Sequence, residues 1–143
     1  VTLHTFPTAE DIAEFGETRL RLLGTGFRAP YIAAVANAVA NGELDLPILN
    51  VLPYIEAKQL LMEFPGIGEK VADCTLLFSI GKLEAFPVDR WIRRAVQEWY
   101  FGGKKLNDKA IHEWAFDYFV PYGGYAQQYL FYQKRSDQTT YGL

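Results

Sequence analysis

Apolar residues recur at three- and four-residue spacing along most of the chain, which is the period of a helix with one buried face. Helix-capping residues, prolines and glycines mark where these segments begin and end. Thr8 and Asn107 are typical N-caps, while Gly42 and Gly81 are typical helix stops. The predicted helices cover residues 8–23, 31–40, 53–64, 69–80, 88–100, 107–120 and 123–135.

The pattern excludes a sheet-based fold. Val, Ile and Thr do not gather into alternating runs joined by a hairpin turn. We therefore expect an all-α fold, formed as one helical domain over residues 1–143, because this length suits a single core. The chain begins with Val instead of Met, so we also expect it to be a fragment of a longer protein.

Composition excludes several classes of protein. Hydrophobic residues make up 50% of the chain, yet no apolar run reaches the roughly 18 residues that a membrane span needs. The N-terminus lacks the basic and apolar layout of a signal peptide. The single cysteine, Cys74, excludes an internal disulfide and cysteine-rich metal sites. We expect an intracellular protein of the cytoplasm, nucleoid or nucleus, with no membrane partner.

Charge is distributed unevenly between the two parts of the chain. The net charge is −3, but residues 1–57 carry seven acidic and three basic side chains, whereas residues 58–143 carry ten acidic and eleven basic ones. A protein that coats nucleic acid through bulk charge is strongly basic, so that class is excluded. An anionic partner should therefore contact the second part of the chain.

Residues 64–70 form the most informative local motif, a predicted helix-hairpin-helix. Gly66 and Gly68 let the backbone turn sharply between two helices, and Pro65 and Ile67 complete the Pro-Gly-Ile-Gly turn. The second helix would point its N-terminal amides and the positive end of its dipole outward, which suits a DNA phosphate. The same composition also fits a glycine-rich connector between two packed helices, so the turn alone leaves both interpretations open.

Two charged residues follow this turn. Lys70 stands just inside the second helix, and Asp89 ends the sequence Phe-Pro-Val-Asp at the start of the next one. Together with the turn, the pair resembles the helix-hairpin-helix DNA glycosylase superfamily, in which a lysine after the hairpin is the nucleophile and the aspartate of Pro-Val-Asp assists it. The sequence Gly-Ile-Gly-Glu-Lys-Val-Ala-Asp-Cys at 66–74 resembles the 8-oxoguanine DNA glycosylase and AP lyase branch. The resemblance covers nearly the whole chain.

The resemblance implies a bifunctional enzyme of base excision repair. Lys70 would attack the sugar C1′, displace an oxidised purine such as 8-oxoguanine, and form a Schiff base that permits β-elimination of the 3′ phosphate. A protonated lysine cannot attack, so burial and the helix dipole are expected to favour its neutral amine. Asp89, held ionised at a helix start, would stabilise the positive charge that develops on the sugar.

A pocket for a flipped base is also implied by the resemblance. Cys74 lies one helical turn after Lys70 and is placed against the base. Gln127 and Phe131, again at i and i+4, would read the base edge and stack on its face. Without the resemblance, Phe131 would be interpreted as a core residue, and Cys74 fits a small buried hydrophobe equally well.

Further implied contacts involve the DNA around the lesion. Phe27 resembles the family's wedge, which fills the space of the extruded nucleotide, and Arg28 resembles the arginine that engages the opposite cytosine. Phe27 fits an ordinary loop anchor as well. Trp91 stands where the vertebrate-like pattern has histidine, so the contact with the DNA backbone is expected to be rearranged. Three arginines of the same predicted helix could compensate or serve as solvated charges, namely Arg90, Arg93 and Arg94.

The chain departs from the family pattern in two further ways. Lys134 stands where members often have an acidic residue three positions after the phenylalanine, which affects the detail of base recognition. Full-length members have an N-terminal β-rich domain and an early helix that complete the lesion pocket, and neither is expected within this sequence. The chain therefore retains the implied catalytic machinery without the region that distinguishes 8-oxoguanine from guanine.

No set of carboxylates or histidines marks a metal site, and His4 and His112 are isolated in the sequence. We expect no cofactor, although backbone carbonyls near Phe64 and Ile67 could hold an alkali or alkaline-earth ion beside a phosphate, as related hairpins do. The expected partner is duplex DNA that contains a damaged base, bound by a monomer. The alternative interpretation is a non-catalytic helix-hairpin-helix DNA-binding module, and a weaker one is a helical protein-interaction domain.

Overall fold

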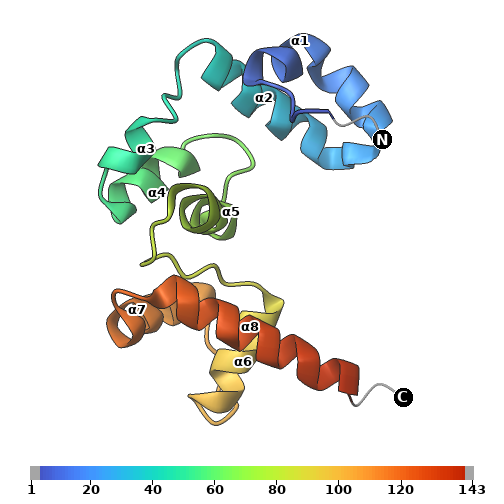
Figure 1. Cartoon of the computed structure of the whole chain (residues 1–143). Coiled ribbons are helices and arrows are strands. Elements are labelled where there is room, and N and C mark those ends of the chain that lie inside the picture. The colour runs from blue at the N-terminus through green and yellow to red at the C-terminus, as the bar shows by residue number, and fades with distance from the viewer. Residues whose placement is uncertain (1–3, 141–143) are drawn as a thin grey trace. The chain divides into compact units, whose positions relative to one another are not determined.

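The computed structural model describes residues 4–140, and every regular element in that range is a helix (Figure 1). The all-α fold predicted from the sequence is therefore confirmed. The chain forms two compact units, Val1–Ile67 and Gly68–Leu143, whose boundary falls within the predicted hairpin. The expectation of a single domain over the whole chain stays a prediction. None of the described helices is long and apolar enough to cross a membrane.

The first unit is built around two helices, α1 (Ala9–Leu20) and α2 (Ala29–Ala40), which lie side by side (Figure 1). A π-helical turn (Arg21–Thr25) and a 3₁₀ turn (Gly26–Arg28) connect them. Pro30 occupies the first turn of α2, as the sequence predicts, because its missing N–H has no helical partner there. The contact between the two helices buries a small core formed by Leu20, Ala29 and Ala33.

A capping box begins α1. Thr8 Oγ1 accepts a hydrogen bond from Asp11 N (3.2 Å), and Asp11 Oδ2 accepts one from Thr8 N (2.9 Å). The backbone bond from Thr8, followed by the hydroxyl bond, holds the pKa of the Asp11 carboxyl below its ordinary value. The helix predicted to continue through Leu23 is interrupted, because Gly16 adopts a φ of +76° that kinks α1, and the α-helix ends at Leu20.

The rest of the first unit leads into the hairpin. It contains α3 (Ile48–Val51) and α4 (Tyr54–Met62), and the latter follows Pro53 as predicted but ends before residue 64. In the turn itself, Ile67 N donates to Phe64 O (3.2 Å). Gly66 has a φ of +83°, and a Cβ atom added there would lie 2.4 Å from Tyr31 Cγ. The turn therefore needs glycine at position 66 both for its backbone conformation and for its contact with α2.

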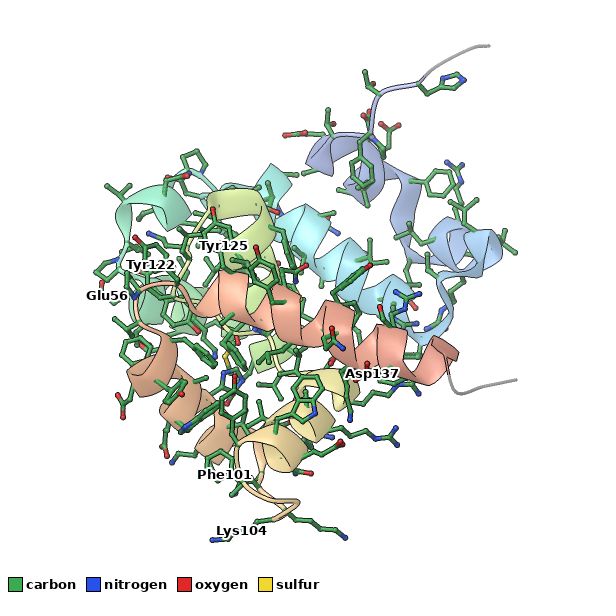
Figure 2. The ribbon with its side chains drawn as sticks, turned by 60° about the horizontal axis from the view of Figure 1, so that its bottom comes forward. Glu56, Phe101, Lys104, Tyr122, Tyr125 and Asp137 are labelled. Carbon is green, nitrogen blue, oxygen red and sulfur yellow. The ribbon has the colours of Figure 1, made fainter. Side chains whose placement is uncertain are left out.

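Among its described residues, the second unit contains four α-helices. They are α5 (Glu69–Thr75), α6 (Arg90–Trp99), α7 (Asp108–Phe119) and α8 (Gly123–Thr140). The long α8 lies against α6 and α7 (Figure 1). Their apolar faces enclose a core that contains Phe86, Val88, Ile92, Val96, Ile111 and Ala115. The loop between α6 and α7 contributes Phe101 to this core, while Lys104 of the same loop is exposed (Figure 2).

Three of the predicted helices in this unit differ from the structure, and the one predicted over 123–135 continues to Thr140. The helix predicted over 69–80 is α-helical only to Thr75 and then continues as a π-helical turn (Leu76–Ile80), which ends at the left-handed Gly81. The helix predicted from residue 88 begins at Arg90 instead. The predicted cap of α7 is confirmed, because Asn107 Oδ1 accepts a hydrogen bond from Ala110 N (2.8 Å).

An ion pair joins α6 to α7. Arg93 donates from Nε to Asp108 Oδ1 (2.6 Å) and from Nη2 to Asp108 Oδ2 (2.7 Å), which is the bidentate geometry that a guanidinium favours. These hydrogen bonds hold the pKa of the Asp108 carboxyl below its ordinary value and raise the pKa of Arg93. Both side chains remain partly exposed, so the pair orients the two helices more than it stabilises them.

Three glycine substitutions separate the two reasons for glycine at position 66, which are its positive φ and its contact with Tyr31. Gly66→Ala is expected to lower the free energy of unfolding by about 2 kcal/mol or more, because it combines an unfavourable φ with a clash against Tyr31. Gly42→Ala has the same backbone cost without a neighbour within 4 Å and should lose about 1 kcal/mol. Gly68→Ala has neither demand and should lose at most about 1 kcal/mol, because Ala is a poorer N-cap for α5 than Gly. Urea unfolding followed by circular dichroism measures all three, and equal losses at 66 and 42 would exclude the clash.

Candidate active site

Asp89 is the N-cap of α6. Its Oδ1 accepts hydrogen bonds from Trp91 N and from Ile92 N, both at 2.8 Å, so it satisfies two amides that have no partner within the helix. The partial positive charge of the helix N-terminus also interacts favourably with the carboxylate. The carboxylate is thus held in one place, and Oδ2 accepts no hydrogen bond from the described residues.

Lys70 stands in the first turn of α5, where the amide dipoles also point outward. Its side chain is exposed, so the burial expected from the sequence is absent in this conformation of the chain. Cys74 follows one helical turn later on the same face and is half-buried. The α5 helix therefore presents an amine and a thiol side by side.

These side chains meet in one pocket of the second unit. Its volume is about 240 Å³, and its walls come from α5 and its π-helical continuation, from the segment before α6, and from α8. The lining residues are Lys70, Cys74, Phe78, Pro87, Asp89, Gln127, Gln128 and Phe131. The structure thus brings together five of the predicted site residues, which come from three separate segments of the sequence, namely Lys70, Cys74, Asp89, Gln127 and Phe131.

The α8 wall of the pocket is held close by a small residue and by side-chain amides. A Cβ atom added to Gly124 would lie 2.2 Å from Leu77 Cδ1, so a larger residue at 124 would require the Leu77 side chain to shift. One turn later, Gln127 is buried, and its Nε2 donates to Pro87 O (3.2 Å). Gln128 Nε2 in turn donates to Gln127 Oε1 (2.5 Å). The pocket wall therefore carries two linked carboxamides.

An adjacent face of α5 is anchored by a histidine from α7. His112 Nε2 lies 3.3 Å from Glu69 Oε2, and His112 Nδ1 lies 3.5 Å from Asp73 Oδ2. The Asp73 side chain is 0% exposed, whereas that of Glu69 is 46% exposed. Glu69 and Asp73 are four residues apart, as Lys70 and Cys74 are, so α5 has one polar face toward α7 and another in the pocket.

The predicted DNA contacts outside the pocket belong to other parts of the chain. Phe27 and Arg28 lie in the 3₁₀ turn of the first unit, both exposed, with the guanidinium carbon 4.4 Å from the centroid of the Phe27 ring. The pocket is built from the second unit alone, so the structure does not bring this pair into it. The hairpin residues Pro65, Gly66 and Ile67 end the first unit, and Gly68 begins the second as the N-cap of α5.

Trp91 is half-buried in the first turn of α6, between two arginines. The guanidinium carbons of Arg90 and Arg94 lie 4.8 Å and 6.0 Å from its ring centroid. Both arginines are exposed, whereas Arg93 is engaged with Asp108. Of the three arginines considered as compensating charges, two therefore remain directed at solvent beside Trp91.

The model of the family described as HhH-GPD superfamily base excision DNA repair protein matches residues 2–116. The chain belongs to this superfamily. The membership predicted from the turn, the lysine and the aspartate is therefore confirmed.

Several relatives within the superfamily carry more specific names. The chain is 37% identical to a probable N-glycosylase/DNA lyase of Methanothermobacter thermautotrophicus, over 94% of this chain and 48% of the relative. It is 32% identical to the N-glycosylase/DNA lyase OGG1 of Arabidopsis thaliana, over 96% of this chain and 40% of the relative. The chain thus spans about half, or less, of the length of these curated relatives.

A solved structure extends the likeness to three dimensions. The Clostridium acetobutylicum 8-oxoguanine glycosylase/lyase, in complex with double-stranded DNA that contains cytosine opposite 8-oxoguanine, superposes with a TM-score of 0.90. It is 37% identical, and the match covers 94% of this chain and 46% of that one. The chain therefore shares its helical fold with part of that DNA-bound glycosylase/lyase.

Three pocket residues of this HhH-GPD chain were not selected from the sequence, namely Phe78, Pro87 and Gln128. Spacing could have indicated Phe78, which follows Cys74 by four residues, but the π-helical turn there changes the helical period. Pro87 stands in the same Pro-Val-Asp sequence as Asp89. Gln128 has no local signal, because its place in the wall depends on how closely α8 approaches the rest of the unit. His112 was likewise set aside as isolated, although it anchors α5.

The ion expected at the hairpin of this HhH-GPD chain stays a prediction. The Phe64 carbonyl oxygen accepts the Ile67 N–H and keeps a second lone pair. Within residues 4–140, no three His, Cys, Asp or Glu side chains form a group that could hold a metal. Backbone carbonyls are thus the ligands that the hairpin itself can offer to such an ion.

Removal of either carboxylate beside His112 tests how α5 is anchored. Asp73→Ala is expected to lower the free energy of unfolding by about 3 kcal/mol, because it leaves a mostly buried imidazole beside a vacated, fully buried position. Glu69→Ala removes a half-exposed partner and should cost no more than about 1 kcal/mol. Urea unfolding of the two variants gives the comparison, and equal losses would contradict an anchor through Asp73.

Proposed function

We propose that this chain is the catalytic part of a bifunctional DNA glycosylase and AP lyase that removes 8-oxoguanine from duplex DNA. The observation that carries the proposal is the pocket in which Lys70 and Asp89 lie together with Cys74, Gln127 and Phe131. A nucleophile, a carboxylate and a surface for a planar base are the parts that excision of a flipped base requires. The names of the relatives support the same reaction and lesion.

The proposed reaction begins at Lys70. The lone pair of its neutral amine attacks the sugar C1′, the bond from C1′ to the base breaks, and the base leaves with the electron pair and takes up a proton. The nitrogen then gives up one proton, and the C1′–O4′ bond breaks as the sugar ring opens. O4′ keeps that electron pair and takes up a proton, which leaves a protonated C1′=N imine. Loss of a C2′ proton then allows the C3′–O bond to break, and the 3′ phosphate leaves with that electron pair.

Two features of the pocket support these roles. Lys70 is exposed in the free chain, and DNA seated over it would exclude water, which favours an uncharged amine. Asp89 is held by two backbone amides, so its carboxylate needs no reorganisation when positive charge develops on the sugar. Duplex DNA with a damaged base is the proposed partner, and we propose that a monomer binds it.

The helix-hairpin-helix DNA-binding module remains the second candidate function. The exposed Lys70 and the capping role of Asp89 favour it, because both residues have a purely structural or electrostatic explanation in the free chain. Such a module would bind duplex DNA in a salt-dependent manner and would cleave no damaged strand.

Borohydride trapping tests the nucleophile. With duplex DNA that contains either 8-oxoguanine opposite cytosine or an abasic site, the chain should form a covalent adduct, because borohydride reduces the imine to a stable amine. Lys70→Gln should abolish adducts on both duplexes while it retains DNA binding, apart from the loss of one charge. Lys82→Gln, a half-buried lysine that does not line the pocket, is the matched control and should form adducts normally.

The outcomes separate the two candidate functions. Adducts on the abasic duplex alone would show lyase chemistry without recognition of the lesion. Binding without any adduct would favour the DNA-binding module. Adducts formed by Lys70→Gln at the wild-type rate would contradict the role of Lys70.

Two substitutions at Asp89 separate its charge from its capping role. Asp89→Asn keeps a carbonyl oxygen as the cap, so the free energy of unfolding should change by less than about 0.5 kcal/mol, whereas Asp89→Ala should lose about 1 kcal/mol. Both variants lack the negative charge, and single-turnover excision should fall by roughly 100-fold or more in each. Thermal unfolding and excision kinetics on the same samples make the comparison. Full activity in Asp89→Asn would rule out the electrostatic role.

A further inference from the structure

The carboxamide of Gln127 is held at both of its ends. Its Nε2 donates to the carbonyl oxygen of Pro87 (3.2 Å), and its Oε1 accepts from Gln128 Nε2 (2.5 Å). A backbone carbonyl can only accept a hydrogen bond, and an amide nitrogen can only donate one. If the carboxamide rotated by half a turn, two oxygens would face each other at one end and two nitrogens at the other. The two contacts therefore agree on one orientation.

This orientation decides what Gln127 can offer to a ligand. Each of the two contacts uses one hydrogen of Nε2 or one lone pair of Oε1, which leaves one of each. A base edge in the pocket would be read through this remaining donor and acceptor. Their positions are set by the rotation of the amide, because Gln127 itself is only 5% exposed and is enclosed by the wall of the pocket.

Gln128 has no part in the hydrophobic core. It is exposed, yet its side chain lines the pocket and turns toward Gln127, although consecutive residues on a helix point about 100° apart. Its contact with Gln127 is therefore made by the side chain and is not imposed by the helix. A substitution at Gln128 should change the pocket wall without unfolding the unit.

We propose that Gln128 is a positioning residue for base recognition, because its donation to Gln127 Oε1 fixes the carboxamide in the orientation that reads a flipped purine. The inference rests on the proposed function and deepens it, since it assigns recognition of the base to a linked pair of amides. Gln128 acts through Gln127 in this role. It is thus expected to affect the reaction only when a base is present in the pocket.

The test compares four substitutions on α8. Gln128→Leu removes the donor with little change in volume, and Gln128→Glu places a carboxylate against the carbonyl oxygen of Gln127. Gln133→Leu and Gln133→Glu are the matched controls, because Gln133 is an exposed glutamine of the same helix that does not line the pocket. Gln133 instead donates to Asp137 (2.8 Å), which lies toward the C-terminal end of α8 (Figure 2).

Single-turnover cleavage is measured on duplexes that differ only at the target position, which is either 8-oxoguanine or an abasic site. Gln128→Leu should slow cleavage of the 8-oxoguanine duplex by roughly three- to tenfold, the effect of one lost hydrogen bond. Gln128→Glu should slow it further, since two acceptors would then face each other. Cleavage of the abasic duplex should stay within about twofold of wild type, because no base is present to be read. The Gln133 variants should match wild type on both duplexes.

A binding measurement makes the result independent of catalysis. In the Lys70→Gln background, fluorescence anisotropy gives the affinity for the 8-oxoguanine duplex relative to a duplex with a tetrahydrofuran abasic analogue. The Gln128 variants should reduce this ratio by roughly three- to tenfold, and the Gln133 variants should not change it. Melting temperatures of all variants confirm that each is folded.

Failure of the inference and failure of the proposed function are distinguishable. A reduced binding ratio in a protein that forms no adducts would support the role of Gln128 and overturn the proposed catalysis. An equal loss on both duplexes, or an unchanged ratio, would overturn the role of Gln128 even if the lyase reaction is intact. A protein that shows no preference for the 8-oxoguanine duplex, or binds neither duplex, would overturn it as well.

Discussion

The hydrogen bonds between Asp89 and the first turn of α6 are the interaction on which the candidate site most depends. A helix begins with amides that have no internal partner, and Asp89 supplies one through Oδ1. The α6 helix carries Ile92 and Val96 into the core, so the carboxylate is coupled to the best-buried part of the second unit. The residue that caps α6 therefore also places a carboxylate in the pocket. In a reaction that develops positive charge, this carboxylate would be a counter-charge that does not have to move.

The α5 helix has polar groups on two faces, one that lines the pocket and one that packs against α7. Its period puts Lys70 and Cys74 on the pocket face, and Glu69 and Asp73 on the face toward α7. His112 lies between the latter two carboxylates, one of them fully buried, and so links α5 to the core helices. A short helix needs tertiary contacts to be stable, and α5 has a polar one through the fully buried Asp73 and an apolar one through the fully buried Ala72.

The sequence predicted most of the helices and five of the residues that line the pocket, because helix ends and short motifs leave local signals. Caps and glycines marked the boundaries, and the turn with Lys70 and the Pro-Val-Asp sequence selected side chains that the fold brings into one pocket. Contacts between distant segments left no such signal. The exposure of Lys70, the anchoring by His112 and the place of Gln128 all depend on how the helices pack against one another. The kink at Gly16 and the π-helical turn after Thr75 likewise override a regular apolar pattern.

The pocket residues and the predicted DNA-contact residues Phe27 and Arg28 lie in different units. Every residue that lines the pocket belongs to the second unit, which includes most of the basic side chains, whereas Phe27 and Arg28 lie exposed in the more acidic first unit. Attack on C1′ needs only groups that surround one nucleotide, but extrusion of that nucleotide needs contacts with its neighbours and with the opposite strand. The chemistry and the distortion of DNA are therefore separable demands. An abasic site has already lost its base, so cleavage there measures the chemistry at C1′ alone. Cleavage at a lesion in a paired duplex also depends on extrusion of the nucleotide.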